Sequence, residues 1–428
     1  MSSNKTIGIV GAGIGGLAAA IALRRAGHDV IVFEQAKQFA RVGADINLTP
    51  NAVRAMDGLG IGEAARVTAA RPSHRISRSY DSGEETSRLE MAETAEQKYG
   101  APQLTIHRAD LLAALAELFP AERVQLGKRA QRIVQNDEGV ELSFEDGSVA
   151  QLAALADMFP AERVALGKRA ETIAADGQGV TLSFSDGTSA RVGVLIGADG
   201  IHSGVRTAMF GAESPRFTGI VAYRAVVPAE RVAGVPNLGA FTKWWGPNPQ
   251  SQIVTFPLNR GKDIFIFATT QQDTWHLESW TAPGSVDELR EQYVAYHPEA
   301  RALLDACDTV LKTALYERDP MPAWAQGRMA LLGDAAHPML PFMAQGAGMA
   351  IEDAVVLSRH LDGVTMAGIP AALQAYQTAR IERASQVQLG SRGNNWLREG
   401  GNADWVYAYD AWAVPLGVPA QGAVAATA

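Results

Sequence analysis

The sequence contains very little cysteine, which limits the kinds of protein it can encode. Cys307 is the single cysteine among 428 residues, so an internal disulfide and a cysteine-based metal site are excluded. The eight histidines form no HExxH-like cluster, and we predict no metal site. The N-terminal residues MSSNKT lead directly into an apolar strand, without the pattern of a signal peptide. We therefore expect a protein of a reducing compartment, the cytoplasm.

Basic surface and long apolar runs are also scarce. The net charge is −8 and no basic stripe with interleaved aromatic residues is present, so nucleic acid is not an expected partner. The apolar run 7–23 has about the minimum length of a membrane span. It contains five glycines, which argue for a turn and against a span, so we expect no membrane partner. The length of 428 residues predicts two or three domains.

A glycine-rich turn near the N-terminus predicts a nucleotide-binding unit. Residues 7–34, IGIVGAGIGGLAAAIALRRAGHDVIVFE, have the pattern of a strand, a G-x-G-x-x-G turn, a helix and a second strand. Gly11 allows the tight turn, Gly13 lets the backbone approach a pyrophosphate, and Gly16 lets helix and strand pack closely. Glu34 follows Gly16 by 18 residues, where a carboxylate can bond a ribose hydroxyl. A βαβ unit whose glycines serve packing alone is the other interpretation, and the motif does not distinguish NAD from FAD.

An internal repeat lies in the first half of the chain. Residues 112–150 and 152–190 are related by an offset of 40 positions, with 25 identities among 39 aligned positions. Each copy predicts a helix and a two-stranded hairpin, and two copies are too few for a solenoid. We interpret the repeat as a structural elaboration without chemistry of its own. Because both copies cannot occupy one place in a sheet, we expect one of them to pack outside it, over an edge strand or in a subunit contact.

The remaining segments differ in their patterns. Residues 61–100 are polar and predict irregular structure, whereas 214–272 alternate in the manner of an antiparallel sheet. Residues 285–315 and 370–392 predict helices. Two later motifs each join a strand to a helix through glycines: VLIGADGIHSGVR (194–206) and RMALLGDAAHPMLPFMAQGAGMAIEDA (328–354).

The three glycine motifs together resemble a known family. In this order, the N-terminal turn, GADGIHS and GDAAHPMLPFMAQGAGMAIEDA are similar to the single-component FAD-dependent aromatic hydroxylases, also called group A flavoprotein monooxygenases. The resemblance covers nearly the whole chain. YGAPQLTIHRADL, ERASQVQ and ADWVYAYDAW look most like the branch of 6-hydroxynicotinate 3-monooxygenase and salicylate hydroxylase. The resemblance implies FAD at the N-terminal turn and NAD(P)H as a transient co-substrate, and no second G-x-G-x-x-G is visible.

The fold that this resemblance implies is α/β. A Rossmann-like FAD-binding domain would comprise residues 1–75, 101–210 and 320–365. An inserted antiparallel-sheet substrate domain would comprise 76–100 and 211–319, followed by C-terminal helices and a tail, 366–428. The tandem helix-hairpin repeat at 112–150 and 152–190 departs from the family, whose members carry one copy.

The resemblance also implies which residues hold the cofactor. Glu34 would face the adenosine ribose, Arg108 the pyrophosphate and ribityl region, Asp199 the pyrophosphate region and Asp334 the ribityl chain. The N–H groups of residues 346–348 would meet the flavin carbonyl, where a helix dipole stabilises negative charge. Two alanines, one in each repeat copy, compete for the place beside the adenine. The full predicted set is Gly11, Gly13, Ile14, Gly15, Gly16, Glu34, Gln35, Arg41, Arg108, Ala130, Ala170, Asp199, Asp334, Gly346, Ala347, Gly348 and Met349.

The activity implied by the resemblance is hydroxylation of a small hydroxylated aromatic or N-heteroaromatic acid. NAD(P)H reduces FAD, the reduced flavin takes up O₂ as a C4a-hydroperoxide, and this species delivers OH to the ring. A hydroxyl of the substrate must ionise, so a base or a proton relay is expected. The predicted catalytic residues are Asn47, Tyr223, His337, Met339 and Pro341, with Lys243 and Trp244 as further pocket candidates on the sheet.

One segment departs from the family pattern. GADINLTPN stands where GAGIHIGPN is expected from the hydroxynicotinate enzymes, so the histidine base is Asn47 here and a glycine is Asp45. An amide cannot act as a base, so either Tyr223 or a water chain removes the proton, or the substrate differs. The competing interpretations are a core tyrosine on a strand for Tyr223, a core or interface role for Trp244, and a loop histidine bonded to the backbone for His337.

Several questions stay open on the sequence. A larger phenolic or quinone-like substrate and a flavin-binding protein without coupled turnover are the alternatives to the hydroxylase of a small acid. The sequence does not reveal the substrate, NADH against NADPH, loss of a carboxylate, the repeat copy at the family position or the oligomeric state. A homo-oligomer is compatible with it.

Overall fold

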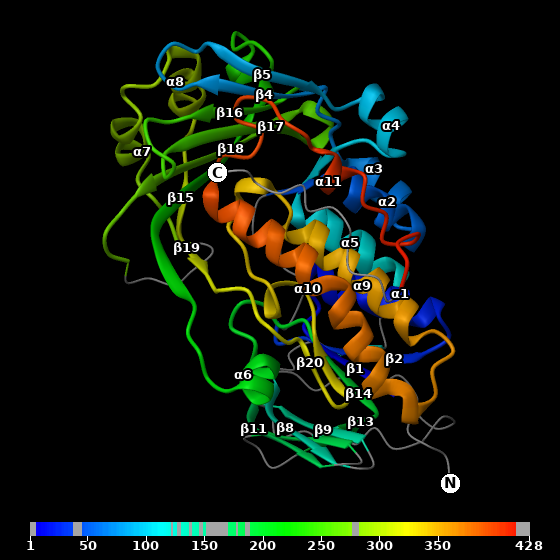
Figure 1. The fold of residues 1–428 in the computed structure, drawn as a ribbon. Coiled ribbons are helices and arrows are strands. Elements are labelled where there is room, and N and C mark those ends of the chain that lie inside the picture. The colour runs from blue at the N-terminus through cyan, green and yellow to red at the C-terminus, as the bar shows by residue number, and fades with distance from the viewer. Residues whose placement is uncertain are drawn as a thin grey trace.

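Two large sheets and a helical layer organise the described residues, and Figure 1 shows the seven-stranded sheet at the top, the mainly parallel sheet in the lower half and a further six-stranded sheet below it. The computed structural model describes residues 6–36, 45–120, 123–125, 130–136, 139–144, 149–150, 170–176, 179–184, 189–275 and 282–416.

A mainly parallel sheet of six strands combines N-terminal strands with strands from the middle and the later part of the chain. Its order is β20-β21-β14-β1-β2-β7, and β20 alone runs antiparallel to its neighbour. The predicted βαβ unit is confirmed, with α1 between β1 and β2. The strands are β20 (Ala325–Gln326), β21 (Met329–Leu331), β14 (Val194–Gly197), β1 (Thr6–Val10), β2 (Asp29–Phe33) and β7 (Val124–Gln125).

Helices cover this sheet and extend toward the second one. The helix α1 (Ile14–Arg25) is apolar on almost every side because it packs between the sheet and α9 (Gly346–Leu361). The long helix α10 (Ile369–Gly393) lies along α9. The helix α10 begins and ends within one residue of the helix predicted at 370–392. The shorter helices are α2 (Pro50–Leu59), α3 (Gly62–Thr68), α5 (Arg108–Leu118), α6 (Gly204–Phe210) and α11 (Asp404–Tyr407).

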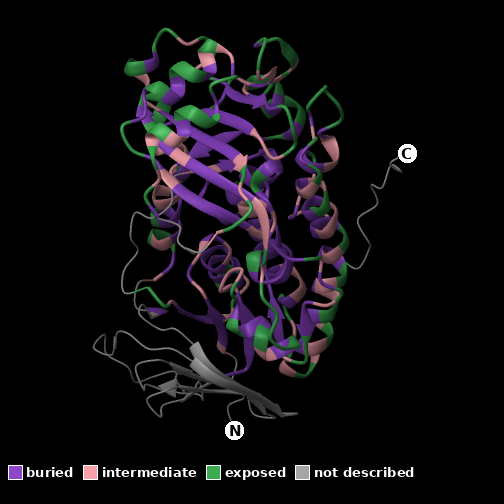
Figure 2. Cartoon of the chain, turned by 90° about the vertical axis from the view of Figure 1, so that its left-hand side faces the viewer, coloured by how far each residue is buried: buried purple, intermediate pink, exposed green. Residues whose placement is uncertain are grey.

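The second sheet has seven strands in the order β19-β15-β18-β17-β16-β4-β5, antiparallel except for the pair β16–β4. Figure 2 shows its central strands almost entirely buried. The helices α7 (Val286–Gln292) and α8 (Pro298–Asp305) pack on one face. The strands are β19 (Leu311–Glu317), β15 (Arg216–Pro228), β18 (Asp263–Gln271), β17 (Gln252–Leu258), β16 (Phe241–Trp245), β4 (His74–Ser79) and β5 (Glu85–Glu90).

The two sheets meet through a small connecting ladder. The strands β3 (Ile46–Leu48) and β6 (Leu104–Ile106) pair antiparallel, and Thr105 Oγ1 donates to the carbonyl oxygen of Pro257 on β17, 2.6 Å away. The prediction of irregular structure for 61–100 was wrong, because this region contains α3, β4, β5 and α4 (Glu93–Tyr99). The helical prediction for 285–315 holds for α7 and α8 but fails at β19, whose buried residues complete the seven-stranded sheet.

Both hairpins of the repeat lie in one additional six-stranded sheet, of order β10-β9-β13-β12-β11-β8. The expectation that one copy packs outside the sheet of the other was therefore wrong: the copies add strands side by side. The helix of the first copy belongs to α5, whereas the corresponding residues of the second copy lie outside the described ranges. The strands are β8 (Ala130–Asn136), β9 (Gly139–Phe144), β10 (Val149–Ala150), β11 (Ala170–Asp176), β12 (Gly179–Phe184) and β13 (Ser189–Val192).

Candidate functional site

The turn between β1 and α1 leaves room for a ligand at the start of the helix. Gly11 has a φ of +102°, and a Cβ there would lie 2.3 Å from the carbonyl oxygen of Ala198. A Cβ on Gly16 would lie 1.9 Å from the carbonyl oxygen of Gly11, so this close packing requires glycine. A Cβ on Gly13 would meet no atom within 4 Å, and Gly13 caps α1 without a side-chain hydrogen bond. The helix N-terminus faces space that suits the phosphates of a dinucleotide.

Glu34 closes one side of this turn. Its carboxylate accepts hydrogen bonds from the backbone N–H of Ala12, at 2.7 Å, and of Ala36, at 2.8 Å. The carboxylate thus lies directly over the glycine turn, where a ribose hydroxyl could reach it. Gln35 beside it is exposed, whereas the side chain of Ile14 is buried and can offer only backbone to a ligand.

Arg108 and Asp334 continue the site away from Glu34. Arg108 is the first residue of α5, and its guanidinium is close enough to Glu34 and Asp334 for both carboxylates to act on it. Burial lowers the pKa of Arg108, and the two carboxylates oppose that shift. Asp334 is exposed to solvent yet surrounded by protein, which raises the pKa of its carboxyl, while His337 and Arg108 act in the opposite sense. A side chain that is exposed to solvent although protein surrounds it lies in a cleft. This cleft is at the carboxyl ends of β2 and β21.

The N-terminus of α9 forms the far end of the cleft. Gly346 and Ala347 are partly exposed, and Gln345 before them is buried. Gln345 Nε2 donates to Thr49 Oγ1 at 2.9 Å, and Gln345 Oε1 accepts from Asn51 Nδ2 at 3.1 Å. These bonds hold the start of a sixteen-residue helix against the end of β3, and its dipole favours negative charge at that point.

The loop before α9 continues this wall of the cleft. Pro341 is exposed and Met339 is half-buried. A Cβ on Gly348 would come within 3.3 Å of Ala52, so that glycine serves the contact of α9 with α2. Met349 is fully buried in a core cluster and can contribute only backbone to the cleft.

One face of the seven-stranded sheet looks toward this loop. Leu340 and Phe342 of the loop pack in one cluster with Ala222 on β15, Phe241 on β16 and other apolar residues of the sheet. Alternation along β15 then places Arg224 on the same face as Ala222, and its guanidinium lies 5.3 Å from the centre of the Phe267 ring. The face therefore combines aromatic rings with polar side chains, which besides Arg224 include Lys243, Gln252 and Thr269.

Asp45 and Arg224 bring charge to the junction of the two sheets. Both side chains keep solvent contact although protein surrounds them, and their charges interact. Burial raises the pKa of Asp45 to about 7, against the lowering effect of Arg224. Arg224 also donates to Thr313 Oγ1. An acid that is partly ionised near neutral pH thus lies where the nucleotide cleft meets the aromatic face.

Comparison with known proteins identifies the family of this chain. The family described as FAD binding domain matches residues 4–154 and 149–390, and the two matches overlap where the first repeat copy ends and the second begins. The 6-hydroxynicotinate 3-monooxygenase of Bordetella bronchiseptica is 36% identical over 416 residues, 97% of this chain and 98% of that protein. This chain belongs to the family of FAD-dependent aromatic hydroxylases.

Two further similar proteins support membership in this family. The 3-hydroxybenzoate 6-hydroxylase of Polaromonas naphthalenivorans is 34% identical, over 90% of this chain and 86% of that protein. A salicylate hydroxylase structure with substrate superposes with a TM-score of 0.74 at 27% identity, covering 96% of each chain. The predicted family and the FAD-binding fold are confirmed. None of the described helices has the length and apolar character needed to cross a membrane.

Two predicted catalytic residues of the hydroxylase lie away from the cleft. Tyr223 is buried in the cluster between the sheet and α7–α8, the opposite face from Arg224, where burial and Glu288 raise its pKa. His337 is also buried, and its Nε2 lies 2.5 Å from Asp353 Oδ2. Asp353 in turn accepts from Arg380 Nε at 2.7 Å. The structure therefore gives both residues core positions, which was the competing interpretation for Tyr223, whereas His337 is bonded to a carboxylate and not to the backbone as its competing interpretation had it.

The two further candidates on β16 lie on opposite faces. Trp244 packs with α8, and its ring stacks on His297 at 5.8 Å. Lys243 is on the cleft-side face, buried beneath the C-terminal segment, and Lys243 Nζ donates to Asn394 Oδ1 at 2.6 Å. Burial, Arg75 and Arg398 together lower its pKa well below the ordinary value.

Asn47 does lie at the junction of the sheets. Its side-chain oxygen accepts from Gln103 Nε2 at 2.7 Å, and its Nδ2 is buried and finds no hydrogen-bond partner among the described residues. Gln103 and Arg224 were not predicted from the sequence. Arg224 follows Tyr223, so recognition of the strand without the phase of its alternation could not find it.

The remaining residues of the predicted cofactor set are Asp199, Arg41, Ala130 and Ala170. The Asp199 carboxylate accepts from Ser203 Oγ at 2.5 Å and from the N–H of Gly204 at 2.8 Å, so it organises the start of α6 behind Gly11. Arg41 lies outside the described residues. Ala130 and Ala170 begin β8 and β11, and β7 of the first copy pairs with β2.

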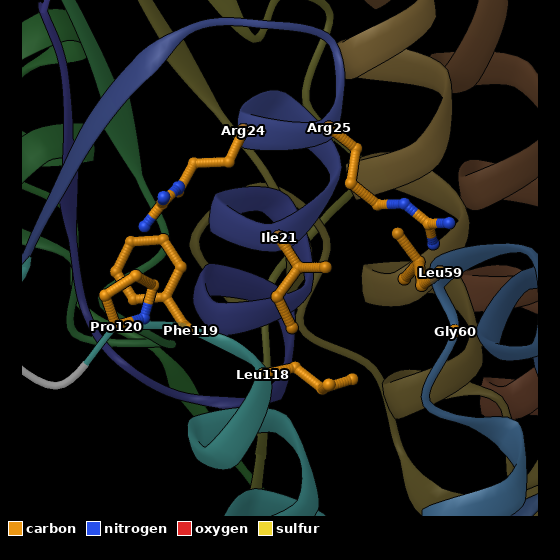
Figure 3. Close-up of a pocket in the computed structure, with 8 residues that line it drawn as sticks. All are labelled: Ile21, Arg24, Arg25, Leu59, Gly60, Leu118, Phe119 and Pro120. Atoms are coloured by element: carbon orange, nitrogen blue, oxygen red, sulfur yellow. The ribbon is translucent and has the colours of Figure 1, made fainter.

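A groove elsewhere on the hydroxylase has no part in this cleft. Figure 3 shows Arg24, Arg25 and Ile21 of α1 beside Phe119 and Pro120, at the opposite end of the helix from the glycine turn. Arg24 lies over the Phe119 ring at 5.5 Å, and Arg25 Nη1 donates to the carbonyl oxygen of Gly58 at 2.7 Å. These contacts hold the helices α1, α2 and α5 together.

Proposed function

We propose that this flavoprotein hydroxylates a small hydroxylated aromatic or N-heteroaromatic acid, with O₂ as co-substrate and NAD(P)H as a transient electron donor. The observation that carries the proposal is the meeting of the nucleotide cleft with an aromatic sheet face that bears Arg224, beside Asp45 and Asn47 of the β3–β6 ladder. The relatives named for 6-hydroxynicotinate and 3-hydroxybenzoate, at 36% and 34% identity, support the substrate class.

The residues of the cleft fit FAD. The glycine turn would hold the pyrophosphate, Glu34 the adenosine ribose, Arg108 the phosphate and ribityl region, and Asp334 the ribityl chain. The N-terminus of α9 would stabilise negative charge on the reduced ring system. Bound FAD supplies the transfer of electrons to O₂ and of one oxygen atom to the substrate. The protein positions the ring, excludes water and removes the hydroxyl proton of the substrate.

The proposal also covers the limits of the domains and the cellular compartment of the protein. Residues 1–75, 101–210 and 320–365 would bind FAD, 76–100 and 211–319 would bind the substrate, and 366–428 would close the structure with helices. The placement of β4, β5 and β15–β19 in one sheet supports this division. Cys307 is buried and free, which suits the reducing cytoplasm.

A panel of acids tests the substrate class. The FAD-loaded protein is mixed with NADH or NADPH and with 6-hydroxynicotinate, salicylate or 3-hydroxybenzoate, and nucleotide oxidation, peroxide and hydroxylated product are measured together. We expect at least one acid to accelerate oxidation and to yield hydroxylated product. Acceleration only by multi-ring phenols would favour the larger substrate. Full flavin loading without acceleration by any acid would contradict the proposal.

A further inference from the structure

We propose that Asp45 is the catalytic base of this hydroxylase, accepting the hydroxyl proton of the bound substrate in place of the histidine that the family resemblance implies at position 47. The inference rests on the proposed function and deepens it.

The alternation of β3 gives Asp45 its direction. Ile46 packs against the core of the FAD-binding half and Leu48 is completely buried in it, so Asp45 and Asn47 face the other way. Thr105 pairs with Asn47 in the ladder and donates a hydrogen bond to the carbonyl oxygen of Pro257 in the seven-stranded sheet. The side of β3 that carries Asp45 and Asn47 is therefore the side toward that sheet. Asp45 thus faces the space between the two sheets.

Arg224 confirms this direction from the opposite wall. It lies on the face of β15 that carries Ala222, within the aromatic surface that includes Phe342 of the loop before α9. Its charge acts on Asp45, so Arg224 and Asp45 are close to one another at the junction. A ring bound between the loop and this face would have its hydroxyl within reach of the Asp45 carboxylate.

The other candidate bases do not meet these conditions. Asn47 has an amide, which cannot take up a proton. Tyr223 faces α7 and α8, and His337 Nε2 is committed to Asp353. Glu352 is bonded by Arg383 inside the core, with both Nε and Nη2 within 2.9 Å of its oxygens. Of these candidates, Asp45 is the one that combines a basic group with solvent contact and a position at the junction.

The groups that surround Asp45 set its charge. From β15, Arg224 is the charged side chain that acts on it most strongly, and it favours the carboxylate. From the β3–β6 ladder the uncharged neighbours are Asn47, Gln103 and Thr105, and the titratable His107 follows β6 directly after Ile106, the partner of Ile46. Burial opposes ionisation, and the balance leaves both protonation states accessible near pH 7. A base with this balance can accept a proton and return it within each turnover.

The proposed step is a simple proton transfer. The O–H bond of the substrate hydroxyl breaks, its electron pair stays on the substrate oxygen, and a new O–H bond forms on Asp45. The substrate becomes an oxyanion whose ring is activated for oxygen transfer, and Asp45 becomes a neutral carboxylic acid. After product release Asp45 returns the proton to solvent.

The experiment compares four FAD-loaded proteins on the acid that the wild type hydroxylates best: wild type, Asp45→Asn, Asp45→Glu, and Asp45→Asn combined with Asn47→His. We measure kcat, KM and the product-to-NAD(P)H ratio from pH 5 to 9, together with flavin content. The absorbance of the bound acid, which reports its ionisation, provides a readout independent of turnover.

We expect Asp45→Asn to keep its flavin, to lower kcat by about 10²-fold or more, and to lose the acidic limb of the pH profile and the oxyanion absorbance. The histidine at position 47 should restore part of kcat, with a limb near the ordinary histidine pKa of about 6.5. Asp45→Glu should retain partial activity.

Undiminished kcat and an unchanged acidic limb in Asp45→Asn would overturn the inference while leaving the proposed function intact. Loss of kcat without any change in the oxyanion absorbance, and without rescue by histidine, would assign Asp45 a structural role and also overturn it. A wild type that hydroxylates no acid would refute the proposed function itself, and the inference with it.

Discussion

Replacing Asp45 by asparagine should stabilise the FAD-free protein, and the gain should grow with pH. The pKa of Asp45 is about 7 in the folded chain against an ordinary value of 3.8. This difference of about 3 pKa units corresponds to about 4 kcal/mol at 1.36 kcal/mol per unit. Because Asp45 keeps some solvent contact, about 4 kcal/mol is an upper limit.

The sign follows from proton linkage. The folded chain binds the proton of Asp45 more tightly than the unfolded chain, so the wild type loses stability as the pH rises from about 4 to about 7. Asparagine resembles the protonated acid and has no such loss. The difference in unfolding free energy between Asp45→Asn and wild type should therefore be small at pH 4 and largest above pH 7.

Urea unfolding of both FAD-free proteins at pH 4, 5.5 and 8 measures this difference. Asp287→Asn is the matched control, because the Asp287 side chain is 88% exposed and its replacement should give a difference that hardly changes with pH. An Asp45→Asn effect that is equal at all three pH values would refute the reasoning about the buried carboxyl at the sheet junction.

Three further changes test other parts of the structure. Gly13→Ala should fold normally but bind FAD more weakly. Gly16→Ala should yield little folded protein, because its Cβ would lie 1.9 Å from a backbone oxygen. Equal FAD affinity and melting temperature in the two variants would contradict this expectation. Asp353→Asn breaks a buried charge pair and should cost about 3–5 kcal/mol in urea unfolding near pH 7. The contribution of Asp353 is present above its ordinary pKa of 3.8 and is lost as the pH falls toward about 2, so wild type and variant should converge in acid. Deleting 112–151 should preserve flavin binding, since 152–159 repeats 112–119 except for two conservative changes and can complete α5; a soluble deletion protein without flavin would show that both copies are needed.

The sequence was most informative where a structure depends on neighbouring residues. The turn between β1 and α1 and the helix after the loop at 339–345 follow from local glycine spacing and apolar periodicity, and both were predicted correctly. The strand β15 was also recognised, but alternation alone does not say which of its two faces is covered by helices. For that reason Tyr223 was chosen and its neighbour Arg224 was missed.

Contacts between distant segments could not be predicted. His337 is paired with Asp353 because α9 folds back over the loop before it, and Arg380 reaches the same carboxylate from α10. The facing of Asp45 and Arg224 joins residues that are far apart along the chain. The sequence did mark Asp45 as a departure from the family, but only the junction of the two sheets shows which charge accompanies it.

The most direct test of the whole account is incorporation of labelled oxygen. The FAD-loaded protein is supplied with NAD(P)H, ¹⁸O₂ and the acid that most accelerates nucleotide oxidation, and the product is analysed by mass spectrometry beside the amount of nucleotide consumed. We predict one ¹⁸O atom in each product molecule and close to one product for each nucleotide oxidised. Unlabelled acid, with peroxide accounting for all of the nucleotide, would contradict the account of this protein as an aromatic hydroxylase of such acids.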